Sequence, residues 1–442
     1  MCAGKRFFIA NETCAAVDTE SWECYNREKV SPERIVFMQS IKSVYKIGNG
    51  PSSSHTVGPY RAAWYIREKY PGARVRVTLY GSLATTGAGH GTQKAIKAVI
   101  PDAEIQNDTE KRDLPHPNTM EFEILFGGKP EKRVQILSIG GGSIRVEGES
   151  FREDMEVYPQ KNFSEIVEYC SEQGIGLSEY VRRYEDEDIF SYLQTVWHAM
   201  EDCVRRGISA DGYLPGGLHL DRKAKKLFES RCYNESLDIS MERTIAAFAY
   251  AVAEESASEH VVVTAPTCGS CGVIPSVLYY MRYYRGYPEK EILEALAVAG
   301  VIGNVIRTNA SISGAECGCQ AEIGSACSMA AAAFAFLNKL NLAQIEFAAE
   351  TAMEHNLGLT CDPVMGLVQI PCIERNAVAA IRAMSAGDLS RFLYETRRIS
   401  FDDIVETMYR TGKDLHEKYR ETAHGGLAVI YTPRQGEELD LS

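Results

Sequence analysis

The chain lacks an excess of positive charge. Its 442 residues include 47 lysines and arginines against 60 aspartates and glutamates, which gives a formal net charge of -13. Proteins that bind nucleic acid neutralise phosphates with clustered lysine and arginine. The charge balance therefore argues against a nucleic-acid partner and favours a small molecule as the ligand.

Long apolar runs are also missing. A membrane-spanning helix needs about 20 apolar residues, and the longest candidate, the alanine-rich segment MAAAAFAFL that begins at Met329, is shorter. The N-terminal segment MCAGKRFFIANETC has no apolar signal-peptide core. We expect no membrane association and a cytoplasmic protein, in which most of the 13 cysteines are free or bind metal, because disulfides do not persist in a reducing compartment.

No low-complexity segment or internal repeat divides the chain, yet its length exceeds that of a usual single core, so we expect two domains. Residues 1–34 show no periodicity and are treated as an N-terminal extension. Residues 35–155 are predicted to form an α/β domain, because residues of alternating polarity and β-branched type recur there. The predicted strands are 74–84, 119–128 and 132–148, and the predicted helices of this domain are 57–69 and 91–99.

Helical patterns replace strand patterns after about Gly148, so residues 160–432 are predicted to form an all-α domain, with the boundary between Glu149 and Phe163. The expected fold class is α+β and multidomain. The expected helices are 162–184, 187–206, 239–257, 289–307, 322–339, 342–355, 374–384 and 402–420. Glycine-rich breaks between these helices are where we place the site, because loops carry function and their backbone groups need partners. These breaks are 213–222, 264–275, 311–320 and 423–429.

Three widely spaced cysteines are the strongest chemical signal. Cys319, Cys361 and Cys372 lie in separate segments interrupted by glycine or proline, too far apart for a compact zinc knuckle. Three thiolates that converge from separate loops suggest an iron-sulfur cluster with one iron free for chemistry. The spacing alone leaves open that they are unrelated buried cysteines, and that Cys317 replaces Cys319. Cys327 is expected to pack in a helix.

Cys268 and Cys271 have the spacing of zinc and dithiol sites. No further ligand pair follows, and the region lacks a βαβ unit. Neither role is therefore expected for this pair.

A serine-rich turn precedes the first predicted helix. Ser52, Ser53, Ser54 and Thr56 offer hydroxyl and amide donors, and His55 adds a titratable group. Amides at the start of a helix attract a carboxylate or a phosphate. A helix cap with surplus serines is the alternative, but this turn has more donors than capping requires.

A second turn, from Gly81 to Ala95, carries His90 in a glycine-rich loop after a predicted strand. It is not a phosphate-binding P-loop, because no GK[ST] follows the glycines, and it does not match GxGxxG. A lone loop histidine is more commonly a surface residue. Its position at the carboxyl end of a strand favours a functional role.

Several long motifs together resemble the iron-sulfur-dependent L-serine dehydratases of bacteria, over about residues 37–429. The matching segments are GPSSSHTVGP, GSLATTGAGHGT, YLPGGL, GSACSMAAA, MEHNLGLTCDPV, IPCIERN and GGLAV. The resemblance implies a substrate-binding-like α/β domain and an all-helical catalytic domain with a 4Fe-4S cluster, fused in one chain where many relatives have separate β and α chains. It also implies amino-acid degradation that supplies pyruvate for gluconeogenesis.

The resemblance also implies roles for single residues. The cluster cysteines fall on Cys319, Cys361 and Cys372, while Cys317 stands where relatives have an apolar residue. His55 and His90 match positions of the substrate pocket. The substrate-binding residues are expected to be Ser52, Ser53, Ser54, Thr56, Thr267, Cys268 and Gly269. Relatives have asparagine where this chain has Cys268, and some end in a cysteine that can reach the cluster, whereas this tail has none.

The expected reaction converts L-serine to pyruvate and ammonia through aminoacrylate, without pyridoxal phosphate. His90 is our first choice for the base and His55 our second. The same chemistry on L-threonine or L-cysteine is the main alternative, and an amino-acid sensor with a non-catalytic cluster is a distant one. We expect a homodimer.

Overall fold

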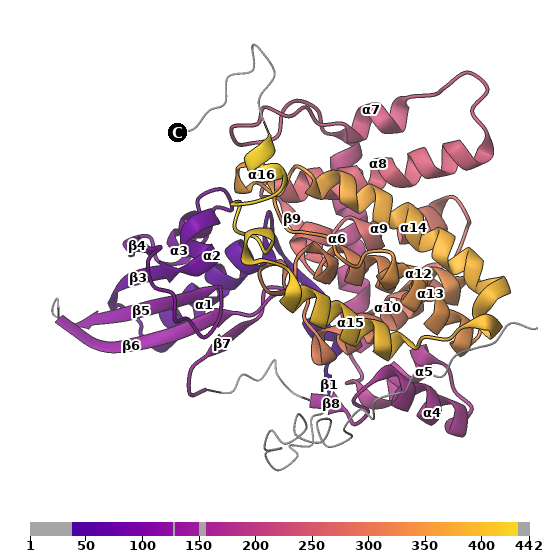
Figure 1. The fold of residues 1–442 in the computed structure, drawn as a ribbon, viewed down its shortest axis with the longest axis horizontal. Coiled ribbons are helices and arrows are strands. Elements are labelled where there is room, and N and C mark those ends of the chain that lie inside the picture. Colours follow the sequence, from indigo (N-terminus) through magenta and orange to yellow (C-terminus); the bar gives the residue numbers. More distant parts are fainter. Residues whose placement is uncertain (1–37, 127–128, 150–155, 432–442) are drawn as a thin grey trace, which may run out of the picture. The chain divides into compact units, whose positions relative to one another are not determined.

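The computed structural model describes residues 38–126, 129–149 and 156–431. The extension predicted for residues 1–34 lies outside them. Residues 37–442 cluster as one unit, and most of the buried apolar side chains in this unit belong to two cores. One core lies between a sheet and its covering helices, and the other lies among helices (Figure 1).

A five-stranded sheet builds the first core. Its strands are β3 (Arg74–Tyr80), β4 (Glu104–Asp108), β5 (Thr119–Phe126), β6 (Lys129–Ser138) and β7 (Ile144–Val146), in the order β4-β3-β5-β6-β7. Only the β3–β4 pair is parallel. The α/β pattern predicted for this region is confirmed, and the segment predicted as one strand, 132–148, is the β6–β7 hairpin.

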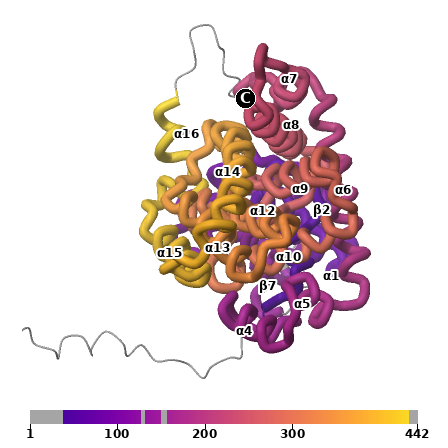
Figure 2. Tube along the Cα trace, turned by 90° about the vertical axis from the view of Figure 1, so that its right-hand side faces the viewer, coloured from indigo at the N-terminus to yellow at the C-terminus, as the bar shows by residue number. Residues whose placement is uncertain are grey.

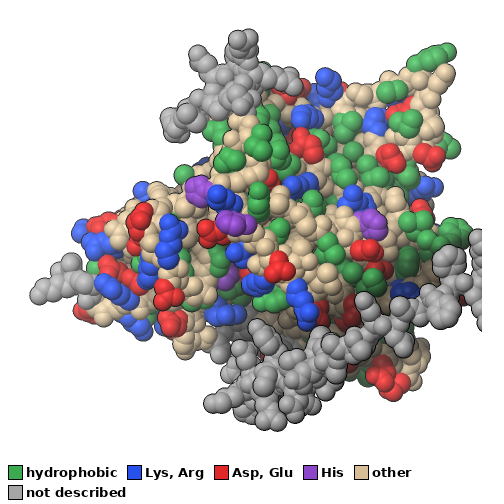
Figure 3. All heavy atoms as spheres, in the orientation of Figure 1, with side chains coloured by type: hydrophobic (Ala, Val, Ile, Leu, Met, Phe, Trp, Pro, Cys, Tyr) green, Lys and Arg blue, Asp and Glu red, His purple; other side chains and the backbone are tan. Residues whose placement is uncertain are grey.

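Helices α1 (Gly58–Lys69) and α3 (Thr92–Val99) supply the apolar side chains that cover one face of the sheet. Alternation along β3 buries Val77 and Leu79 against them. The opposite face is charged, and Glu123 there pairs with an arginine on each neighbouring strand. Figure 3 shows lysine, arginine, aspartate and glutamate side chains interspersed on this part of the surface.

The second core surrounds α12 (Ile323–Leu337), in which every side chain except that of Phe336 is buried. Four helices pack against it, as Figures 1 and 2 show: α9 (Val273–Tyr283), α10 (Glu289–Asn309), α13 (Leu342–Glu354) and α14 (Cys372–Leu393). Glycines allow neighbouring helices to pack closely against α12. A Cβ atom on Gly303 of α10 would lie 2.7 Å from the sulfur of Met329.

In the described part of the chain, one stretch is long and apolar enough to cross a membrane, Cys319–Leu337. Its most apolar window is 89% buried inside the protein. This degree of burial is typical of a helix in the core of a protein.

The remaining helices agree in part with the prediction. Helix 162–184 is two helices, α4 (Phe163–Gln173) and α5 (Leu177–Tyr184), because Gly174 ends the first with a left-handed φ of 63°. The predicted helices α6, α8 and α15 are present, at Ile189–Ser209, Leu237–Ala257 and Phe401–Asp414. Helices α7 (Ala224–Glu229) and α9 were not predicted.

Two short strand pairs connect distant parts of the sequence. Strand β1 (Met38–Gln39) pairs with β8 (Glu156–Tyr158), and β2 (Lys46–Asn49) pairs with β9 (Val261–Thr264). Ile41 and Tyr45 consequently lie in the helical core, not in the sheet core. The chain leaves β2 directly into the serine-rich turn, so this turn lies where the two cores meet. The domain boundary between Glu149 and Phe163 stays a prediction.

Candidate functional site

The serine-rich turn forms a single π-helical turn, Ser53–Val57, before α1. Ser52 caps it, because its hydroxyl accepts a hydrogen bond from the amide of His55 at 3.1 Å. From β6, the Ser138 hydroxyl donates to the carbonyl of Ser54 at 2.8 Å. This contact requires a glycine at position 58, since a Cβ atom there would lie 2.2 Å from the Ser138 oxygen.

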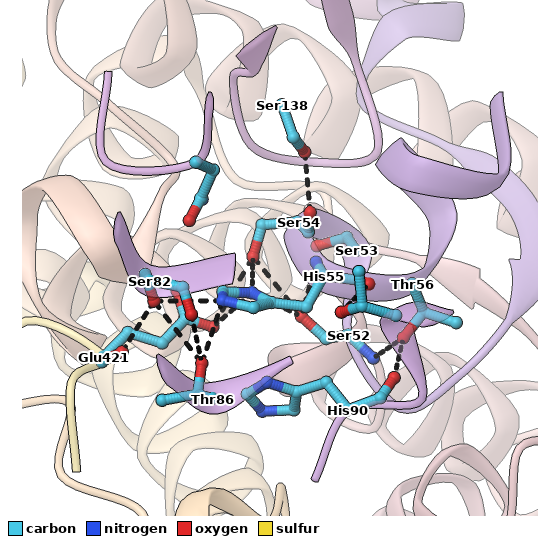
Figure 4. Close-up of polar contacts among 12 residues, drawn as sticks. Ser52, Ser53, Ser54, His55, Thr56, Ser82, Thr86, His90, Ser138 and Glu421 are labelled. Atoms are coloured by element: carbon cyan, nitrogen blue, oxygen red, sulfur yellow. Dashed lines mark hydrogen bonds and ion pairs between the residues drawn. The ribbon is translucent and has the colours of Figure 1, made fainter. Parts of the chain in front are cut away.

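The imidazole of His55 is completely buried and held at both nitrogens (Figure 4). Nδ1 lies 2.9 Å from the Ser54 hydroxyl and 3.3 Å from a carboxylate oxygen of Glu421. Nε2 lies 3.0 Å from the hydroxyls of both Ser82 and Thr86, which follow β3 in α2 (Gly81–Thr86). Four partners therefore fix the orientation of this ring.

The second histidine, His90, lies beside the first, with 4.5 Å between the ring centroids. Its side chain is only 1% exposed, yet neither ring nitrogen has a hydrogen-bond partner. Burial, and then the charge of His55, lower the pKa of His90 to about 3. The ring is therefore neutral near pH 7. The Thr56 hydroxyl donates to the carbonyl of His90 at 2.7 Å, so Thr56 positions the His90 loop.

Glu421 completes this cluster and was not predicted. It is 5% exposed and has a left-handed φ of 58°. Its amide donates to the carbonyl of Cys361 at 2.8 Å, and its carbonyl accepts from Ser82 at 2.8 Å. Burial alone would raise the pKa of the Glu421 carboxyl, but the charge and the hydrogen bond of His55 lower it. The second carboxylate oxygen of Glu421 has no partner.

The three predicted cysteines come together next to Glu421. Cys319 follows Gly318 in the turn before α12, Cys361 pairs with the C-terminal segment, and Cys372 is the first residue of α14. Burial first, and then nearby negative charges that include Cys319 and Cys372, raise the pKa of Cys361 well above its usual value. The pKa of Cys372 is raised in the same way. The thiols are therefore protonated near pH 7 in the metal-free protein, and a metal ion that bound them would have to displace their protons.

The three sulfurs do not all lie within 4.8 Å of one another. Among the described residues, one set of three candidate ligands has its atoms within 4.8 Å of one another, and it does not contain the cysteines. A zinc ion bound at about 2.3 Å would bring two sulfurs within about 4.6 Å. Arg375 hydrogen-bonds Cys319, and the thiols raise the pKa of its guanidinium although burial opposes this. This positive charge suits an anionic cluster.

Glu322 connects the cysteines to the loop at residues 267–269. A Cβ atom on Gly269 would lie 3.3 Å from its carboxylate, and Thr267 hydrogen-bonds it. Burial, and then the charge of Glu421, raise the pKa of Glu322 to about 8. The amide of Cys268 donates to the Ser53 hydroxyl at 3.4 Å, which brings this loop against the serine-rich turn.

The neighbouring cysteines face other parts of the fold. Cys317 packs against α15, where a Cβ atom on Gly412 would lie 2.5 Å from the Cβ of Cys317. The thiol of Cys327 donates to the carbonyl of Ala379 at 3.2 Å within the helical core. The expectation that Cys327 is a packing residue is confirmed.

Sequence reasoning placed both histidines near a pocket but missed the residues that hold them and the cysteines. Ser82 and Thr86 are one helical turn apart, and Arg375 is three positions after Cys372, so both spacings were available as signals. Glu421 has no such local signal. The missed residues are Ser82, Thr86, Glu322, Arg375 and Glu421.

Comparison with known proteins gives a consistent result. A family model described as "Serine dehydratase alpha chain" matches residues 92–428, and one described as "Serine dehydratase beta chain" matches residues 40–100. The chain is 40% identical to an L-serine dehydratase of Haemophilus influenzae and 39% identical to L-serine dehydratase 2 of Escherichia coli. Each alignment covers 89% of this chain and 99% of the relative. An L-serine dehydratase of Helicobacter pylori is 38% identical over 88% of this chain and 98% of the relative. The chain therefore belongs to the serine dehydratase family, with the beta-type and alpha-type regions fused in one polypeptide.

Proposed function

We propose that this protein is an L-serine dehydratase. It removes water from L-serine to give aminoacrylate, whose imine tautomer takes up water and releases ammonia and pyruvate. The observation that carries the proposal is the position of Glu421. Its carboxylate lies 3.3 Å from Nδ1 of His55, while its backbone amide donates a hydrogen bond to the carbonyl of Cys361 at 2.8 Å. Groups that can move a proton thus adjoin groups that can hold a metal cluster. The similarity to L-serine dehydratases supports L-serine as the substrate.

Cys319, Cys361 and Cys372 would hold a 4Fe-4S cluster, and Arg375 would offset its negative charge. When bound, the cluster supplies a Lewis acid for the substrate hydroxyl. A cradle for it exists at Gly314, where a Cβ atom would lie 3.2 Å from the Cys361 sulfur. Pyridoxal phosphate has no part in this proposal.

The serine-rich turn would bind the substrate carboxylate. The turn is the first turn of the helical segment that continues as α1, and NH groups at the start of a helix favour an anion. The loop at residues 267–269 contacts the same turn through the amide of Cys268 and the Ser53 hydroxyl. Because Cys268 replaces an asparagine of the family, the preference among serine, threonine and cysteine is a separate question, which an assay of 2-oxoacid formation from each would decide.

His90 would remove the α-proton. Its ring is neutral and neither nitrogen has a partner, so the nitrogen that carries no hydrogen can accept a proton from a bound substrate. The negative charge of Glu421 opposes the fall of the His90 pKa and would stabilise the protonated ring. His55 is the second candidate, with Glu421 behind its Nδ1 atom.

Anaerobic reconstitution with iron and sulfide, followed by an assay of pyruvate released from L-serine, tests the proposal. His90→Ala should abolish turnover and leave the cluster absorbance unchanged. His198→Ala is the matched control, because this exposed histidine on α6 pairs only with Glu289 in the described structure. Near-normal turnover of His90→Ala would overturn the assignment of the base.

We also propose a cytoplasmic homodimer. The described cysteines are free thiols, which supports a reducing compartment. Size-exclusion chromatography with light scattering would measure the oligomeric state.

A further inference from the structure

The two histidines and Glu421 also have the composition of a metal site. His55, His90 and Glu421 each offer one ligand atom, and these atoms lie within 4.8 Å of one another. All three residues are buried. Nδ1 of His55 lies 3.3 Å from a carboxylate oxygen of Glu421. Two imidazoles and one carboxylate are the ligand types that zinc and similar divalent ions use.

Unpartnered atoms in this trio point to a ligand. Buried polar atoms nearly always have a hydrogen-bond partner, yet both ring nitrogens of His90 and one carboxylate oxygen of Glu421 have none. His90 is neutral near pH 7, so a metal ion would not have to displace a proton from it. A divalent cation would satisfy these atoms together and would compensate the buried negative charge.

The surroundings hold the ligands in place. The Nε2 atom of His55 lies 3.0 Å from the hydroxyls of Ser82 and Thr86, which leaves Nδ1 directed at the Ser54 hydroxyl and at Glu421. Metal-bound imidazoles are commonly oriented in this way through the second nitrogen. The backbone of Glu421 is fixed at its amide by Cys361 and at its carbonyl by Ser82. These contacts hold the ring of His55 and the backbone of Glu421 in place.

We propose that His55, His90 and Glu421 bind one divalent transition-metal ion of the zinc type, and that this ion inhibits the enzyme. The binding follows from the geometry of the trio alone. The inhibition rests on the proposed function, because a metal bound to His90 takes the lone pair that would accept the α-proton. The site is separate from the cysteine set and has no sulfur ligand.

Zinc titration of the reconstituted holoenzyme tests both statements, because the cluster then occupies the three thiolates. Bound zinc is measured by equilibrium dialysis, iron content and cluster absorbance are followed in the same samples, and pyruvate formation is assayed. Wild type and His198→Ala should each bind one zinc ion in this site and lose turnover, with unchanged iron content. His90→Gln and Glu421→Gln should each bind zinc at least about 100-fold more weakly. Circular dichroism checks that both variants are folded.

Equal zinc affinity in wild type and both folded variants would overturn the site. So would zinc uptake that is matched by loss of iron, since zinc would then have entered the cysteine set. Zinc bound at the trio without loss of turnover would overturn the inhibition. A zinc-free holoenzyme that forms no pyruvate would contradict the proposed function instead, and the zinc stoichiometry of the variants would still decide whether the site exists.

Discussion

Gly314 lies close to both Cys361 and Glu322, so Gly314→Ala tests the cradle for the cluster. This glycine is the first residue of α11 (Gly314–Cys317). A Cβ atom there would lie 2.6 Å from a carboxylate oxygen of Glu322 and 3.2 Å from the sulfur of Cys361. Both separations are shorter than ordinary van der Waals contact, so at least one neighbour must move.

The size of the effect follows from which neighbour can move. Glu322 can rotate its carboxylate away, but Cys361 is held by backbone hydrogen bonds to Tyr419 and Glu421. Overpacking of this kind costs about 1–3 kcal/mol, which corresponds to a factor of about 5–150 in an equilibrium or a rate. Alanine is a better helix former than glycine, so we expect the variant to fold. The loss should appear in cluster content and in turnover.

Iron content per chain and the rate of pyruvate formation, measured after anaerobic reconstitution, are the assay. The control is Gly176→Ala, because no heavy atom lies within 4 Å of a Cβ built at Gly176. Gly176 is the N-cap of α5, so this control should lose less than about 1 kcal/mol of stability and no activity. If Gly314→Ala matches the control in both iron content and rate, the reasoning about the cradle is wrong.

Two further predictions concern the histidine cluster. Glu421→Gln keeps the length and backbone contacts of the residue but removes its charge, so kcat/KM for L-serine should fall about 10²–10⁴-fold at unchanged iron content. His90 has a folded-state pKa of about 3, lowered mainly by burial, so protons bind the unfolded chain first as the pH falls below about 6.5. The free energy of unfolding of cluster-free wild type should therefore fall with pH more steeply than that of cluster-free His90→Gln. Between about pH 6 and pH 4 the difference should reach up to about 1.4 kcal/mol per pH unit, measured by urea denaturation.

These two predictions fail in different ways. A loss of less than tenfold in kcat/KM for Glu421→Gln would show that the carboxylate does not support proton transfer by either histidine. Parallel stability curves for wild type and His90→Gln would show that water or another group already satisfies the ring of His90.

The parts of the fold that local patterns specify were predictable. Val75, Val77 and Leu79 alternate with polar residues, and this pattern predicted β3. Strand β4 was missed because it lies at the sheet edge with little buried apolar surface. Helix α14 was predicted to end at residue 384 but continues to Leu393. Gly387 within it packs against the ring of Phe334, where a Cβ atom would lie 2.5 Å away.

The candidate site was predictable only where its residues stand in concentrated motifs. His55 follows β2 and His90 follows β3 and α2, and the structure brings their ring centroids to 4.5 Å from each other. Glu421 stands in a polar segment without periodicity, and its burial depends on pairing with Cys361, 60 residues away in sequence. Pairing between β2 and β9, which sets the position of the serine-rich turn, joins segments that are farther apart still. Such long-range contacts leave no local pattern in the sequence.

The most direct test of the central claim compares wild type with Cys361→Ser after anaerobic reconstitution, by pyruvate release from L-serine. The account predicts that wild type binds about four iron atoms per chain and forms pyruvate, and that the variant loses both properties while its fold persists. Pyruvate formation by the cluster-free wild type, or by Cys361→Ser at the wild-type rate, would contradict it.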